Sequence, residues 1–201
     1  MRILSILSIA VALMVWTSLP AAADEVTDQI EEGLKLYKEG KYAQAASELE
    51  FAVQQIRQRQ AVLLKDLFPD PLSGWKADEP ETKAAGAAFF GGGISASRTY
   101  YKGGSQIEIE FVSESPLLQS MLMFLSNPML MAASGEGELV KIKGYKAINK
   151  YNANERSGEI NIVVANKVLV TVRGSGLEGP DILMDFAKAT ALEKIERFAL
   201  Q

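Results

Sequence analysis

The stretch EINIVVANKVLVTVR, residues 159–173, sets the fold class of this chain. It holds two runs of apolar and β-branched residues, 159–165 and 168–173, with Asn166 and Lys167 between them. Two such runs joined by a tight polar turn are typical of a β-hairpin. The stretch therefore predicts two antiparallel strands near the end of the chain.

The same alternation of apolar and polar residues predicts four further strands, at residues 95–102, 106–112, 139–143 and 145–151. A Gly-Gly pair joins the first two of these as a second hairpin. Side chains of an extended strand point alternately to two faces, so Glu108 and Glu110 share one face. We expect that face to be exposed and to carry Lys141 and Lys143, which can pair with the glutamates across strands.

Two apolar helices are expected at residues 116–126 and 180–189, each with a proline at its first turn. Thr190 and Glu193 can cap one more short helical turn. The order of two strands, a helix, four strands and a last helix predicts an α+β domain over residues 84–201. Because hairpins dominate this order, we expect a mainly antiparallel sheet that the two helices cover on one face.

The residues before this domain have a different spacing of apolar side chains. Residues 24–66 have the apolar spacing of two amphipathic helices, interrupted at Glu39-Gly40-Lys41, which predicts a helical hairpin. Residues 67–83 contain three prolines, which prevent a helix and predict an extended connector. We expect Trp75 to anchor this connector to the following core.

The hairpin resembles a single tetratricopeptide repeat. The likeness rests on small residues where the helices meet, on the turn, and on a small-large-small rhythm in helix two: Gly33, Gly40, Tyr42, Ala45, Leu49 and Ala52. Gln29 and Arg57 depart from the family pattern, which often has Trp and Pro there. One repeat cannot bury its own apolar face, so the resemblance implies that this face packs on the rest of the chain, a second copy or a partner. The candidate partner face is Leu36, Leu49, Leu63 and Leu64. A plain hairpin docked on the following domain is the alternative.

Residues 67–198 are similar to an uncharacterised domain of bacterial exported proteins. The likeness lies in four short motifs: LSGW at 72–75, FGGG at 90–93, SPLL at 115–118 and GEIN at 158–161. It implies a fold near the Mog1/PsbP-like α+β sandwiches, and it implies no catalytic residues.

Residues 1–23 combine a basic start, an apolar core and an Ala-x-Ala ending, the pattern of a cleavable signal peptide. We expect cleavage after Ala23 and a periplasmic location. An uncleaved membrane anchor is the alternative, but the apolar core is shorter than the ~20 residues that span a bilayer. We expect no membrane span after signal cleavage, and the absence of cysteine excludes lipid attachment through a cysteine.

The 201-residue chain contains no histidine and no cysteine. This excludes Ser-His-Asp and Cys-His catalysis, and it excludes the usual zinc and copper sites. A net charge of −4 argues against nucleic-acid binding. We therefore expect no enzymatic activity and no cofactor; a hydrolase that works without His or Cys is the least favoured hypothesis.

Residues 174–179, GSGLEG, match the GxGxxG pattern of dinucleotide sites. A Rossmann unit needs another parallel strand after the helix that follows the motif, and the sequence ends at Gln201 before one can form. We therefore expect a glycine-rich turn from a strand to a helix, with no nucleotide.

Five apolar residues are candidates for a ligand groove: Phe89, Phe90, Met121, Met123 and Phe124. Such side chains also fill ordinary cores, so both interpretations stay open. The leading functional hypothesis is a non-enzymatic periplasmic adaptor that binds another exported protein or a second copy. A periplasmic carrier of an apolar ligand, bound in this groove, is the alternative.

Overall fold

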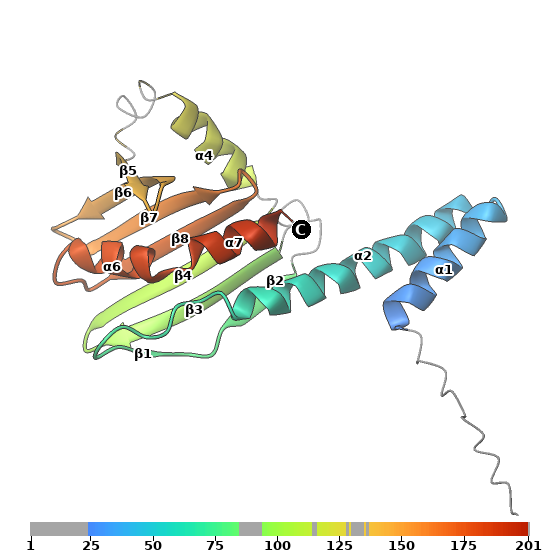
Figure 1. The fold of residues 1–201 in the computed structure, drawn as a ribbon, viewed down its shortest axis with the longest axis horizontal. Helices are drawn as coiled ribbons and strands as arrows, with labels where there is room; N and C mark the ends of the chain where they lie inside the picture. Colours follow the sequence, from blue (N-terminus) through green and yellow to red (C-terminus); the bar gives the residue numbers. More distant parts are fainter. Residues whose placement is uncertain are drawn as a thin grey trace, which may run out of the picture.

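The computed structural model describes residues 24–84, 94–113, 116–127, 129, 135 and 137–200 (Figure 1). The predicted signal peptide, residues 1–23, lies outside the described residues. Within the described ranges, no helix has both the length and the apolar character needed to cross a bilayer.

The chain begins with the predicted helical hairpin, formed by α1 (Glu25–Lys38) and α2 (Tyr42–Lys65). The Asp24 side chain accepts a hydrogen bond from the backbone N–H of Val26 and so caps α1. Asp24 also forms an ion pair with Arg59, which fixes the start of α1 beside α2. The helices approach closely at Gly33, where an added Cβ would lie 2.8 Å from the side chain of Leu49. A small residue is therefore needed at this crossing.

The described strands form one eight-stranded antiparallel sheet in the order β1-β3-β4-β8-β7-β6-β5, with β2 also paired to β3. Their bounds are β1 Lys76–Ala77, β2 Glu81–Ala84, β3 Ile94–Lys102, β4 Ser105–Ser113, β5 Glu138–Ile142, β6 Tyr145–Asn152, β7 Ser157–Val164 and β8 Val168–Ser175. The hairpin from the opening stretch is β7–β8. Its turn takes three residues, 165–167, rather than the two expected, and Ala165 and Asn166 both have positive φ. The segment predicted as a connector contributes two short strands, β1 and most of β2, to one edge of the sheet.

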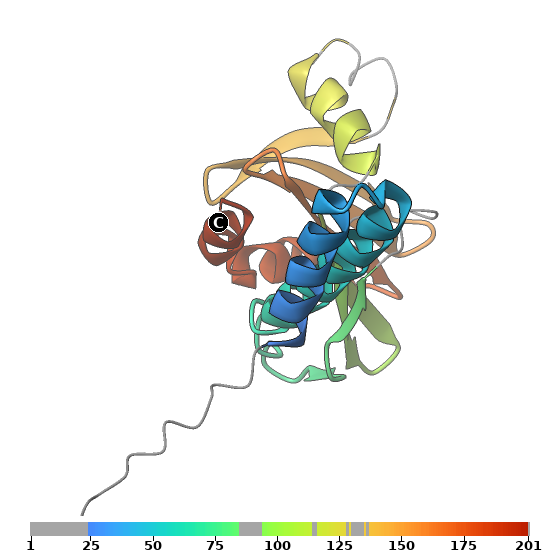
Figure 2. The same ribbon diagram turned by 90° about the vertical axis from the view of Figure 1, so that its right-hand side faces the viewer.

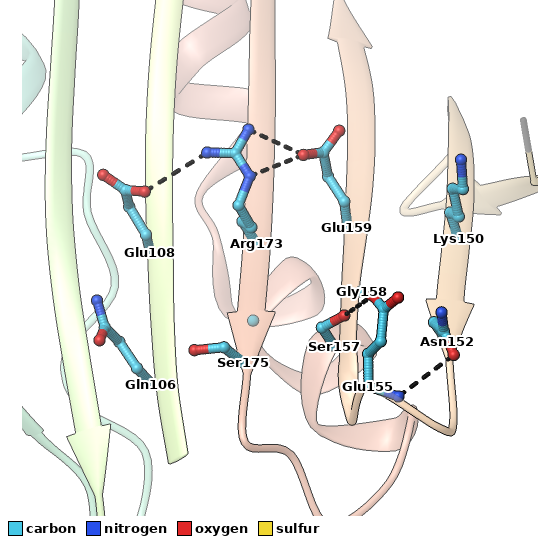
Figure 3. Close-up of a pocket in the computed structure, with 11 residues that line it drawn as sticks. Gln106, Glu108, Lys150, Asn152, Glu155, Ser157, Gly158, Glu159, Arg173 and Ser175 are labelled. Carbon is cyan, nitrogen blue, oxygen red and sulfur yellow. Dashed lines mark hydrogen bonds and ion pairs between the residues drawn. The ribbon is translucent and has the colours of Figure 1, made fainter. Parts of the chain in front are cut away.

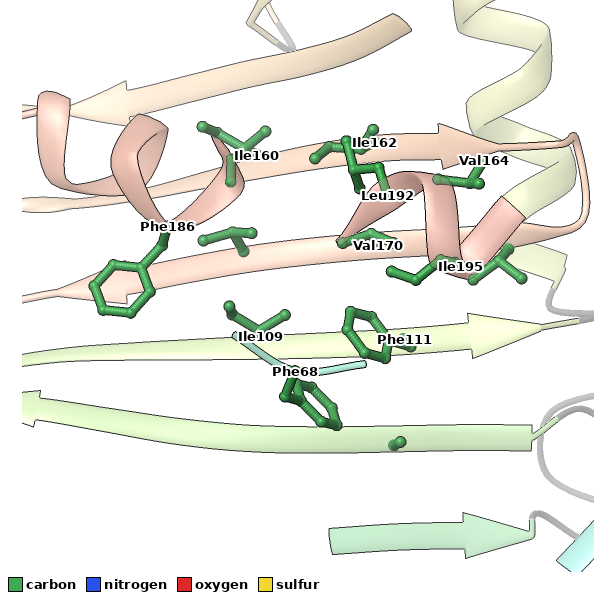
Figure 4. Packing of buried hydrophobic residues seen from close by; sticks show 14 of the residues in the cluster. Phe68, Ile109, Phe111, Ile160, Ile162, Val164, Val170, Phe186, Leu192 and Ile195 are labelled. Carbon is green, nitrogen blue, oxygen red and sulfur yellow. The ribbon is translucent and has the colours of Figure 1, made fainter. Parts of the chain in front are cut away.

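Three helices in the described part of the chain pack with the sheet: α4 (Pro116–Ser126), α6 (Asp181–Ala189) and α7 (Leu192–Ala199). The α+β class is confirmed, and two helices do cover one face, but the pair is α6 and α7. Ile160, Ile162 and Val170 point toward α6 and α7 (Figure 4). Val163 and Leu169 point to the opposite face, where they pack with α4. The helix at 116–126 was therefore expected on the wrong face, and the sheet has helices on both sides.

The segment between the hairpin and the sheet is held by aromatic contacts. Phe68 stacks on Phe111, with ring centroids 4.2 Å apart. The ring edge of Trp75 meets Phe186 at 4.9 Å, as expected for a residue that anchors this segment. The Tyr100 hydroxyl donates to the carbonyl oxygen of Pro69 at 2.8 Å. These contacts place Phe68 in the domain core and hold Pro69 and Trp75 against it.

Replacement of Tyr100 by phenylalanine should change how stability depends on alkaline pH. Burial raises the pKa of Tyr100 from its usual value of 10.0 to about 12. Because the folded protein favours the neutral tyrosine, its contribution to stability is fully present below pH 10. This contribution is lost as the pH rises from 10 through 12, where ionisation of the tyrosine favours the unfolded chain. Tyr100→Phe should cost about 1 kcal/mol at pH 7, the hydrogen bond to Pro69.

Urea unfolding of both chains at steps from pH 7 to 11.5 measures the difference. The difference in free energy of unfolding between the wild type and Tyr100→Phe should narrow above pH 10, because only the wild type loses the contribution of this tyrosine. Parallel pH profiles for the two chains would contradict the prediction.

Candidate functional site

One face of the hairpin exposes large apolar side chains. We call it the hairpin face, and its members are Ile30, Leu34 and Tyr37 on α1 with Tyr42, Leu49, Val53 and Ile56 on α2, each between 38% and 65% exposed. The residues on each helix recur at helical spacing, so they lie along one side of that helix. Leu49 contacts the helix crossing at Gly33, and the rings of Tyr37 and Tyr42 meet at 5.5 Å beside the turn. These two contacts put the apolar sides of both helices on the same face.

The opposite face of the hairpin is more polar. Gln29 of α1 donates a hydrogen bond to Glu48 of α2 across this face. Phe51 and Val62, also exposed, lie here beside Glu25 and several glutamines of α2. The apolar residues of the hairpin are therefore concentrated on one side and interspersed with polar groups on the other.

The hairpin extends away from the sheet (Figures 1 and 2). It joins the rest of the domain through the second half of α2, where Ala61 and Leu64 enter the main core. α1 lies beside the first half of α2, which is the half farther from the sheet. The hairpin face consequently stands clear of the core that stabilises the domain.

The four residues of the predicted partner face differ in their exposure and position. Leu49 belongs to the hairpin face, Leu36 is half-buried between the helices, and Leu63 is 55% exposed further along α2. Leu64 is only 1% exposed and packs in the main core, so it cannot contact a partner and its assignment is wrong. Tyr37 and Tyr42 were missed, although their helical spacing to Leu34 and Leu49 could have identified them.

A second candidate is a polar depression of about 560 Å³ on the sheet face that lies opposite α6 and α7 (Figure 3). Arg173 of β8 lies at its centre, between Glu108 of β4 and Glu159 of β7 (Figure 3). Its guanidinium Nη2 is 2.8 Å from Glu159, and Nη1 is 3.6 Å from Glu108. Asn161 donates to Glu159, and the Thr171 hydroxyl donates to Asn161 at 2.9 Å. The charges are thus engaged with each other.

This geometry corrects the expected pairing of the glutamates with Lys141 and Lys143. Strand β5, which carries Lys141, lies at the far edge of the sheet from β4, with three strands between them. Lys143 follows β5 and donates to the carbonyl oxygen of Thr190 at 3.1 Å, on the side of α6 and α7. Glu108 instead pairs with Arg173, its direct neighbour in the β4–β8 register.

The charges at the centre of the depression are paired: Arg173 lies between the carboxylates of Glu108 and Glu159. Among the residues that the structure describes, no group of three or more acidic, histidine or cysteine side chains could hold a metal ion. We therefore regard the polar depression as a solvated network across three strands.

The candidate apolar groove is partly formed. Met121 and Phe124 of α4 line a depression of about 230 Å³ with Ile148, and Lys150, Glu159 and Asn161 form its polar side. Met123 is 60% exposed and is not among the residues that line the depression. Phe89 and Phe90 lie outside the described residues. The structure thus brings two of the five predicted groove residues together over the sheet.

Comparisons with protein-family models, with curated proteins and with solved structures gave no significant match. The two resemblances noted in the sequence stay predictions, and the functional argument rests on the geometry of this chain.

Proposed function

We propose that the protein is an exported, non-enzymatic interaction module that binds a partner protein through the hairpin face. The observation that carries this proposal is the exposure of seven large apolar side chains on one side of a helical pair. Monomeric proteins rarely leave such a continuous patch in water, because water contact with apolar surface is unfavourable.

The size of the hairpin face supports binding of a protein. From the exposed fractions of its side chains, the face presents roughly 700 Å², close to the ~800 Å² that each partner buries in a standard interface. Two tyrosines lie at its outer end, and tyrosine is enriched among residues that dominate binding energy. The surface is therefore large enough for a specific complex.

Cross-linking capture from an exported-protein fraction tests the proposal, with residues 24–201 as bait. The double variant Leu34→Glu/Val53→Glu places two charges on the hairpin face and should reduce capture of any specific partner about tenfold or more. The matched control is Phe51→Glu/Val62→Glu, which places two charges on the opposite face of the same hairpin. It should capture the partner as well as the wild type does.

Substitution is preferable to removal of residues 24–66, because that deletion would take Ala61 and Leu64 out of the core. Thermal unfolding should confirm that both double variants are folded. Equal capture by Leu34→Glu/Val53→Glu and the wild type would refute the proposed function.

The second candidate function is a carrier of a small amphipathic ligand, favoured by the depression that Met121 and Phe124 form over Ile148. Its volume of about 230 Å³ lies below the ~300–1,000 Å³ of typical ligand pockets, which makes it the weaker candidate. Native mass spectrometry of gently purified protein should reveal bound mass, and Met121→Glu should abolish it. Repeated absence of bound mass would exclude this function.

A further inference from the structure

Two carboxylates flank the hairpin face at the middle of its length. Glu31 follows Ile30 on α1, and Glu50 follows Leu49 on α2; both are exposed. A helical residue is rotated by about 100° from the one before it, so each glutamate lies at the outer edge of the face. A helix lying along the hairpin face between α1 and α2 would pass Glu31 on one side and Glu50 on the other.

Lys35 follows Leu34 but forms an ion pair with Glu32 at 3.0 Å. The other cations near the hairpin face lie toward its ends. Lys38 follows Tyr37 beside the turn. Arg57 follows Ile56 where α2 reaches the domain, and it lines a depression there with Phe198. The middle of the face, where a bound helix would be most fully enclosed, is thus acidic at both edges.

We propose that the hairpin face binds an amphipathic helix whose apolar stripe is flanked by lysine or arginine side chains. This inference rests on the proposed function, because it names the chemistry of the partner at the same surface. The apolar stripe would cover the hairpin face, and the basic flanks would meet Glu31 and Glu50. Helix-in-groove binding of this kind needs residues at helical spacing on both sides, which α1 and α2 supply.

A second copy of the chain fits this surface less well. Glu31 lies seven residues before Lys38, and Glu50 lies eight after Tyr42, so the two carboxylates stand at nearly the same height above the turn. Two hairpins packed face to face would bring these carboxylates together near the middle, with their turns at the same end or at opposite ends. Like charges placed together across an interface oppose association.

Two synthetic peptide probes test the inference. Both carry leucine at helical spacing; one has lysine and the other glutamate at the positions that flank the stripe. Fluorescence anisotropy with residues 24–201 should give binding about tenfold tighter for the lysine-flanked peptide, and high salt should reduce the difference.

Charge reversal at the edges supplies the specific variant. Glu31→Lys/Glu50→Lys should reverse the preference, so that the glutamate-flanked peptide binds more tightly. The control Asp28→Lys/Asp185→Lys changes the net charge equally at exposed helical positions away from the edges, and it should keep the wild-type preference.

The outcomes separate this inference from the proposed function. If both peptides bind the wild type equally, or if Glu31→Lys/Glu50→Lys keeps the lysine preference, the inference is wrong while the proposed function stands. If Leu34→Glu/Val53→Glu binds the lysine-flanked peptide like the wild type, the hairpin face is not the docking surface and both fail. A wild-type dimer that this variant dissociates in sedimentation would assign the face to a second copy and overturn the inference.

Discussion

Replacement of Phe186 by alanine is expected to destabilise the protein by about 4 kcal/mol, the middle of the range for a buried phenylalanine. Phe186 is fully buried on α6. Its ring lies 4.9 Å from Tyr100 on β3 and 4.9 Å from Trp75 in the segment after the hairpin. Alanine would leave a cavity where a helix, a strand and that segment meet.

Chemical denaturation measures this loss. The loss is a large fraction of the total stability, which is only about 5–15 kcal/mol for a domain of this size. The matched control is Phe51→Ala on the hairpin, where the phenylalanine is 48% exposed and the cost should be about 1 kcal/mol or less. If Phe186→Ala leaves too little folded protein, Phe186→Leu should still show a measurable part of the loss. Similar losses for Phe186→Ala and Phe51→Ala would contradict the position of α6 on the sheet.

Local patterns predicted the elements of this fold well. Alternation of apolar and polar residues identified six strands because each side chain in an extended strand faces the core or the other side. The Gly-Gly pair and Asn166 located two turns because both turns need backbone conformations that these residues adopt at low cost. Gly33 indicated the helix crossing, where only a small residue fits against Leu49.

The placement of α4 could not be predicted in the same way. Residues 116–126 are apolar on nearly every side, so their sequence does not state which face of the sheet they cover. That choice follows from Val163 and Leu169, single apolar residues on the otherwise polar side of β7 and β8. They continue the apolar runs of those strands, and a continuous run does not separate one face from the other.

The candidate site shows a similar limit. Leu63 and Leu64 are adjacent and chemically identical, yet one is 55% exposed and the other 1%. The difference depends on how α2 meets β2 and β3, which helical spacing alone does not determine. The pairing of Glu108 with Arg173 depends on β8 lying beside β4, although 54 residues, 114–167, separate the two strands and would allow other strand orders. Sequence spacing thus predicts which residues share a side of one element, and the neighbouring element decides their role.

The second large expected effect is a loss of stability in Gly176→Ala, within the GSGLEG motif. Gly176 has φ +65°, and an added Cβ would collide with the carbonyl oxygen of Gly104 in the β3–β4 turn. The backbone of Gly176 is also held in place, because its carbonyl oxygen accepts a hydrogen bond from Ser105 Oγ at 2.8 Å. Leu177, the next residue, is fully buried. Strain at positive φ and a clash with fixed backbone together should cost roughly 3–4 kcal/mol.

Gly179→Ala is the control within the same motif. Gly179 has no positive φ, and nothing lies within 4 Å of an added Cβ, so alanine there should change stability by less than about 1 kcal/mol. Denaturation of both variants tests why this motif is rich in glycine. A large loss at Gly176 alone would show that close packing of the turn on the β3–β4 hairpin requires glycine, with no need for a phosphate to explain it. Equal, small effects at both positions would mean that the turn does not pack on Gly104, and the glycines would then need another explanation.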